Sequence, residues 1–159
     1  MHQLAIIVVL SLVLASAPAP ARAESTPTKL TTADIQRVLT AAVAKAHEIG
    51  VPMGISVVDE GGNLVGFIKM DGAFIHTNQT SFSKAYTAAS IRKPSGSSGI
   101  PPEITKEIAS VTNGKFTTLP GGQPLVKDGK IVGGVGVGGG KGDQDEAVAK
   151  AGVDALAGK

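Results

Sequence analysis

The sequence contains no cysteine and no tryptophan, and it has only one tyrosine and four phenylalanines among 159 residues. The lack of cysteine excludes disulfides, thiolate catalysis, and cysteine-ligated zinc or iron–sulfur centres. Because aromatic residues are scarce, the core must be built mainly from Val, Ile, Leu and Ala. A domain of this length buries enough apolar surface to fold without disulfides.

Excess charge of either sign is also missing. The chain has 15 Lys and Arg against 13 Asp and Glu, a formal net charge of +2. Binding to nucleic acid relies on concentrated Lys and Arg facing the phosphates. We therefore expect no nucleic acid partner.

The first 23 residues differ from the rest. An apolar run from Leu4 to Leu14 has the length of a signal-peptide core, and Ala21-Arg22-Ala23 offers a small-residue cleavage site before Glu24. A buried N-terminal helix is the alternative, but the prolines after the run disfavour it. We predict a signal peptide over residues 1–23, a short arm over 24–30 and one domain over 31–159, in the periplasm or secreted. No later segment is long and apolar enough for a membrane span.

Four helices are expected. Apolar residues recur at three- and four-residue spacing from Ile35 to Ala46, after a capping Thr31 and before Gly50, which suits a helix C-terminus. A second helix, rich in Ala, Ser and Thr, is expected from about Ile75 to Ser90. A short helix is expected over Glu103–Val111 and a final one from about Asp143 to Leu156.

Two hairpins are expected between these helices. The strand-like runs Gly54–Asp59 and Leu64–Lys69 flank a glycine-rich turn, and Asp128-Gly129 is a type I′ turn signal between Leu125–Lys127 and Lys130–Val132. Residues 119–124 are expected to form a turn cluster before the second hairpin. Two hairpins with flanking helices predict an α+β domain, an antiparallel sheet covered by helices.

The glycine-rich run Gly133–Gly140 raises the question of nucleotide binding. A phosphate-binding P-loop requires Ser or Thr after the lysine, whereas Gly142 follows Lys141. A dinucleotide site requires a parallel βαβ unit, and the preceding hairpin indicates antiparallel strands. The simpler interpretation is a strand whose glycines permit close approach of a helix or another subunit. An anion bound at the start of the last helix stays open, although the acidic residues there oppose it.

Catalytic residues are not apparent. The histidines after the signal peptide are His47 and His76, and no nucleophile-elbow motif is present. Two separated histidines without cysteine make a poor zinc ligand set, so the metal remains unknown. An enzyme would have to use Asp59, Glu60 or Asp71, which turn formation explains more simply.

The segment Lys69–Arg92 concentrates side chains that could bind a ligand. Thr80, Lys84 and Thr87 share a helical face. His76 and Tyr86 are possible iron ligands, and a cation from this segment could pair with a carboxylate.

Four stretches together resemble the GlcG/HbpS-like family, also called the haem-degrading domain family. They are SVVDEGGNLVGFIKMDGA (56–73), SKAYTAASIRKPS (83–95), LPGGQPLVKDGKIVGGVGVGG (119–139) and DQDEAVAKAGVDAL (143–156). The resemblance implies a profilin-like layered fold, homo-oligomers and haem binding. Related domains occur in corrinoid adenosyltransferases of the PduO type, so a corrinoid is the less favoured cofactor. The resemblance also carries over Thr87 as a haem-site residue.

These observations lead to one functional hypothesis and its alternatives. We expect an exported haem- or tetrapyrrole-binding protein, acting in haem or iron sequestration or sensing. The alternatives are an enzyme acting on haem or a small organic acid, and a non-catalytic oligomeric accessory protein. The homo-oligomer is expected to form through the Gly133–Gly140 strand and the second helix, whose side chains are small. The candidate haem-site residues are His76, Lys84, Tyr86, Thr87 and Arg92.

Overall fold

The computed structural model describes residues 28–159, so the expected signal peptide and most of the expected arm lie outside the described residues. The chain forms one α+β domain, which confirms the expected class. The elements are α1 (Thr32–Ile49), β1 (Gly54–Asp59), β2 (Leu64–Lys69), α2 (Thr77–Ile91), η1 (Ser95–Ser97), α3 (Pro102–Val111), β3 (Gly122–Lys127), β4 (Lys130–Gly138) and α4 (Gly142–Leu156).

The four strands form a single antiparallel sheet in the order β2-β1-β4-β3. Both expected hairpins are confirmed, as β1–β2 and β3–β4, and β1 pairs with β4 at the centre. Asp128 and Gly129 have φ of 51° and 72°, as a type I′ turn requires at both central residues. The two hairpins therefore join through β1 and β4 into one sheet, whose edge strands are β2 and β3.

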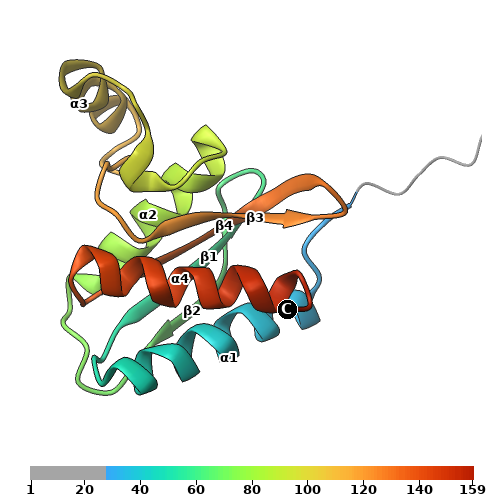
Figure 1. Cartoon of the computed structure of the whole chain (residues 1–159). Coiled ribbons are helices and arrows are strands. Elements are labelled where there is room, and N and C mark those ends of the chain that lie inside the picture. Colours follow the sequence, from blue (N-terminus) through green and yellow to red (C-terminus); the bar gives the residue numbers. More distant parts are fainter. Residues whose placement is uncertain (1–27) are drawn as a thin grey trace, which may run out of the picture.

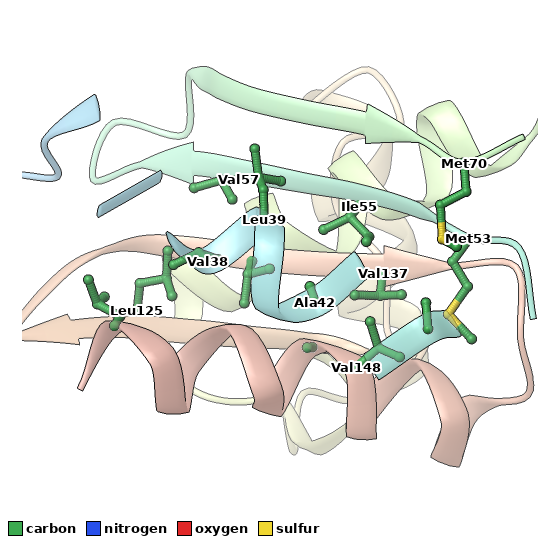
Figure 2. Packing of buried hydrophobic residues seen from close by; sticks show 14 of the residues in the cluster. Val38, Leu39, Ala42, Met53, Ile55, Val57, Met70, Leu125, Val137 and Val148 are labelled. Atoms are coloured by element: carbon green, nitrogen blue, oxygen red, sulfur yellow. Dashed lines mark hydrogen bonds between the residues drawn. The ribbon is translucent and has the colours of Figure 1, made fainter. Parts of the chain in front are cut away.

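Helices α1 and α4 lie side by side on one face of this sheet (Figure 1). They bury aliphatic side chains against those of the inner strands, and Val38, Val148, Ile55 and Val137 are all fully buried (Figure 2). Asp34 fixes the start of α1, since it closes a capping box with Thr31 and pairs with Lys127 of β3 at 2.7 Å. The hydrogen bonds from Lys127 and from Thr31 hold the pKa of Asp34 well below its usual range.

Helix α2 covers the opposite face, against β1 and β4 (Figure 1). A Cβ added to Gly136 would lie 2.1 Å from the carbonyl oxygen of Ser81, and one added to Gly134 would lie 2.4 Å from that of Ala85. The glycines of β4 thus permit close packing of α2 inside one chain. The close approach expected at these glycines is therefore made by a helix of the same chain, and the β4 face that they form is covered by α2.

Two boundaries differ from expectation. Strand β3 begins at Gly122, not at Leu125. Because β3 is an edge strand, it tolerates Pro124, which has no backbone N–H to donate to a neighbouring strand. Helix α2 begins at Thr77 rather than Ile75, and His76 directly precedes it.

Helix α3 projects away from the sheet (Figure 1), and none of its residues is buried. The short helix expected over Glu103–Val111 is confirmed with one more residue, Pro102, at its start. Among the described residues, no helix has both the length and the hydropathy needed to cross a bilayer.

Candidate functional site

A groove of about 370 Å³ opens where the start of α2 meets the loop before α4. Its volume lies within the range of small-molecule sites. The walls come from three segments distant in sequence: the start of α2, the loop before β3, and the glycine-rich end of β4. The lining residues are Phe74, His76, Thr80, Lys84, Leu119, Pro120, Gly139, Gly140, Gly142 and Asp145.

The mouth of the groove carries an aromatic pair. The rings of Phe74 and His76 stack with centroids 5.7 Å apart and an interplanar angle of 14°. Both side chains are exposed, Phe74 to 64%. Leu119, on the opposite wall, is 50% exposed. The mouth therefore presents an accessible imidazole within an exposed apolar surface, an unusual place for large apolar groups unless something covers them.

The deep end of the groove is polar and charged. Lys84 of α2 is buried and donates to the carbonyl oxygen of Val137 at 2.7 Å and to the carboxylate of Asp145 at 2.6 Å. Asp145 also accepts from the backbone N–H of Gly140 at 2.9 Å. This ion pair joins α2, β4 and α4 at one point. It fixes the glycine loop that forms one wall.

Burial raises the pKa of Asp145, and the hydrogen bond and positive charge of Lys84 oppose that rise. Thr80 lies one helical turn before Lys84, and its hydroxyl is buried without a hydrogen-bond partner among the described residues. The groove thus has an apolar mouth and a polar floor, where the opposite charges of Lys84 and Asp145 offset each other.

The structure brings together two of the five candidate residues. His76 and Lys84 line the same groove, His76 at the mouth and Lys84 at the floor. Lys84 is already paired with Asp145. A bond from Lys84 to a ligand carboxylate would therefore have to share or replace that partner.

The other three candidates lie elsewhere. Thr87 is fully buried, and its hydroxyl accepts from the N–H of Thr117 at 2.9 Å. The half-buried ring of Tyr86 packs beside Gly62 and Phe82, with the Lys115 ammonium 6.0 Å from its centroid.

Arg92 follows the last residue of α2 with φ of 58°, and about 12 Å of helix separates it from Lys84, the groove residue nearest to it along α2. Of the three residues expected to share a helical face, Thr80 and Lys84 line the groove and Thr87 does not.

A second cavity, of about 490 Å³, lies between the end of α1 and β2. Its lining includes Val43, Ile68 and Met70, with His47 and Lys69 also present. His47 is exposed and occupies the last turn of α1, where the helix dipole favours a cation, as expected. This cavity is the larger of the two, but it contains none of the candidate haem-site residues.

The three carboxylates of the enzyme alternative, Asp59, Glu60 and Asp71, do not come together in the groove at α2 or in the cavity between α1 and β2. Asp59 accepts hydrogen bonds from the backbone of Gly61 and Asn63 and so holds the β1–β2 turn. Hydrogen bonds from that turn lower its pKa, against the opposing effect of burial. Within residues 28–159, no group of three or more His, Asp or Glu side chains is arranged to hold a metal ion.

Several groove residues were missed in the sequence. Asp145 lies in the DQDEAV stretch and Pro120 in the LPGG stretch, both of which carried the family resemblance. Neither stretch contains a recognisable ligand motif, so only the fold shows that both reach α2. Phe74 could have been found, since it precedes His76 by two residues beside a turn.

Known proteins support the fold and its relationships. A protein of 15.0 kDa from the dhaT-dhaS intergenic region of Citrobacter freundii is 36% identical over 128 residues, covering 79% of this chain and 90% of that protein. Protein GlcG of Escherichia coli K12 is 36% identical, over 63% of this chain and 74% of its own. The corrinoid adenosyltransferase PduO of Salmonella typhimurium is 31% identical, but the chain spans only 40% of its length.

Solved structures agree with these relatives. A complex of PduOC with haem superposes with a TM-score of 0.73 at 29% identity, covering 80% of this chain and 95% of that chain. A double mutant of HbpS from Streptomyces reticuli gives a TM-score of 0.69 at 32% identity, covering 89% and 98%. The family model described as haem degrading protein HbpS-like matches residues 30–154. The chain therefore belongs to the HbpS-like haem-degrading family.

Proposed function

We propose that this protein is exported and binds haem in the groove at the start of α2, with His76 as the iron ligand. One observation carries the proposal: an exposed imidazole stacks on an exposed phenyl ring at the mouth of an apolar groove. Membership of a haem-degrading family and the structural match to a PduOC–haem complex support haem as the ligand. Sequestration or sensing of haem or iron is the role we propose for an exported binder.

The residues of the groove fit a haem group. A porphyrin offers a broad apolar face, and Phe74, Leu119 and Pro120 offer apolar surface on both sides of the mouth. A neutral imidazole is a common axial ligand of haem iron, and the ring of His76 is accessible. Bound haem would supply an iron centre for ligand binding or redox chemistry.

The chain's own residues would orient the group. The stacking of Phe74 on His76 restricts the imidazole ring, and the Lys84–Asp145 pair holds the glycine wall. Lys141 is exposed between Gly140 and Gly142, which both line the groove. We propose Lys141 as the cation for a propionate, in place of Lys84, which is paired with Asp145, or of Arg92, which lies beyond the end of α2.

A haemin titration followed by the Soret band tests the proposal. We expect saturable binding by the unaltered protein and at least roughly tenfold weaker binding by His76→Ala, equivalent to about 1.4 kcal/mol. The Soret maximum of the variant should also shift, because the axial ligand has changed. His47→Ala is the matched control, since His47 is an exposed histidine at the other cavity.

The two histidines make the result decisive. Equal affinity and an unchanged spectrum for His76→Ala would overturn this site, and loss of binding in His47→Ala would place haem in the α1–β2 cavity instead. Binding no tighter than that of an unrelated protein would remove the proposed function itself.

Export has its own test. The full sequence, expressed in a Gram-negative host, should be recovered from the periplasm or medium with Glu24 as its N-terminus by mass spectrometry. Recovery in the cytoplasm with the first 23 residues intact would contradict export. The homo-oligomer also remains a prediction, although the glycines of β4 are covered by α2 of the same chain.

A further inference from the structure

The two edges of the sheet are protected to different degrees. Strand β3 carries Pro124, and the N–H of its first residue, Gly122, donates to the hydroxyl of Ser95. Both features are ways in which an edge strand avoids pairing with another chain. Strand β2 has no proline, and β1 is its only strand neighbour within the described residues. Figure 2 shows it as the outermost strand, ending beside Met70.

The register shows which backbone groups of β2 face outward. The N–H of Met70 donates to the carbonyl oxygen of Met53, and in the same ladder Ile55 pairs with Ile68 and Val57 with Gly66. Hydrogen-bonded pairs recur at every second residue of an antiparallel ladder, so Ile68 and Gly66 direct their backbone groups to β1. The intervening residues Phe67 and Lys69 therefore direct their N–H and C=O groups to the open edge.

The side chains at this edge are apolar and exposed. Leu64 is 51% exposed and Phe67 is 39% exposed. Phe67 pairs with Ser56, whose hydroxyl contacts Ser81 of α2, so Phe67 lies on the α2 face of the sheet. Helix α2 packs mainly on β1 and β4 and leaves this part of the face uncovered. An exposed edge with apolar side chains is a place where another strand adds.

We propose that the β2 edge is a dimer interface, where a second copy of this chain adds its own β2 antiparallel about a two-fold axis at Phe67. In this register Phe67 lies opposite the partner subunit's Phe67, and Lys69 lies opposite the partner subunit's Val65. Four strands of each copy then form one eight-stranded sheet.

The composition of β2 favours a second copy over an unrelated strand. A two-fold axis brings like residues together only at its centre, and there β2 has an aromatic residue that gains from self-pairing. Its one charge, on Lys69, lies away from the axis and faces no second lysine. A register centred one residue earlier would place Gly66, which has no side chain, opposite the partner subunit's Gly66 and would gain no such contact.

Single-cysteine variants read this register directly, because the natural chain has no cysteine. Residues opposite each other in a hydrogen-bonded pair have Cα atoms about 5.5 Å apart, within reach of a disulfide. We expect Phe67→Cys to form a covalent dimer under mild oxidation. The matched control is Lys69→Cys on the same edge, where the two copies of the residue lie about 13 Å apart, four residues along the strand.

The expected difference is cross-linking at position 67 at least roughly tenfold faster than at position 69, since the paired thiols have a high effective concentration. Equal rates, or faster cross-linking at Lys69→Cys, would overturn the register.

Sedimentation of the haem-free protein gives the second measurement. The unaltered protein should dimerise as its concentration rises, and Phe67→Glu should stay monomeric because two carboxylates would meet at the axis. Val126→Glu, on the exposed part of the β3 edge, should leave the dimer intact. A mass of one chain for the unaltered protein at all concentrations, or an unaffected dimer in Phe67→Glu, would disprove the interface. Neither measurement uses haem, so failure here is separate from failure of the haem site.

Discussion

The two faces of the sheet are filled in opposite ways. On the α1–α4 face, branched aliphatic side chains such as Val38, Val57, Val135 and Val148 interlock in the core. On the α2 face, the backbone of the helix lies directly against glycines of β4. The groups buried there are mostly small or polar, and they include a serine pair and a lysine–aspartate pair.

This difference indicates that the two faces of the sheet tolerate substitutions to different degrees. Aliphatic packing gains stability from buried area and tolerates changes that keep volume and shape. The α2 face has little side-chain volume to rearrange, so it depends on the absence of Cβ atoms and on satisfied polar partners. The groove lies at one end of the α2 face, where the contacts that hold the helix tolerate few amino-acid substitutions.

The largest expected effect is at Gly136 in β4. In Gly136→Val the new side chain would meet the backbone of α2 at Ser81 and Ala85, and backbone cannot move aside as a side chain can. We expect the free energy of unfolding to fall by more than about 4 kcal/mol. Val135→Ala, the neighbouring residue on the α1–α4 face, should cost only about 2 kcal/mol through a cavity.

Urea denaturation of the two variants makes that comparison. If Gly136→Val costs no more than Val135→Ala, the close approach of α2 to β4 is not a constraint on the fold, and the contrast between the faces fails.

A smaller effect is expected at Lys84. Lys84→Met keeps most of the side-chain length but leaves Asp145 buried without its cation. Breaking a buried ion pair in this way should cost about 3 kcal/mol at neutral pH. The double variant Lys84→Met/Asp145→Asn should recover part of the loss, because no unpaired charge remains.

The pH dependence of that cost separates charge from packing. Removing Lys84 removes the interactions that lower the pKa of Asp145, so burial raises that pKa further above its ordinary value of 3.8. A carboxyl with a raised pKa gains stability as the pH falls through its folded pKa towards 3.8. The difference in unfolding free energy between Lys84→Met and the unaltered protein should therefore shrink on acidification. A constant difference would attribute the cost to packing alone.

Much of the fold was predictable because local signals and tertiary structure agree. Thr31 and Gly50 bound α1, and the Asp128-Gly129 turn sets the β3–β4 hairpin. The candidate site was only partly predictable. His76 and Lys84 come within one groove because α2 carries both, but Asp145 reaches Lys84 across 61 residues of sequence. Helical spacing could not show that the hydroxyl of Thr87 would accept a hydrogen bond from the N–H of Thr117, since that contact depends on the path of an irregular segment.

The smallest expected effect concerns the serine pair, and it tests whether polar satisfaction governs the α2 face. Ser56 of β1 and Ser81 of α2 are both fully buried, and their hydroxyl oxygens lie 2.7 Å apart. Ser56→Ala leaves the Ser81 hydroxyl without this partner and should cost about 1–2 kcal/mol, and Ser81→Ala should cost a similar amount. The double variant removes both groups and should cost less than the sum of the two, because no orphaned hydroxyl remains. Denaturation of the four proteins completes the cycle. Strictly additive costs would mean that each hydroxyl finds another partner, and that steric fit to glycine, rather than hydrogen bonding, is what holds this part of α2 against the sheet.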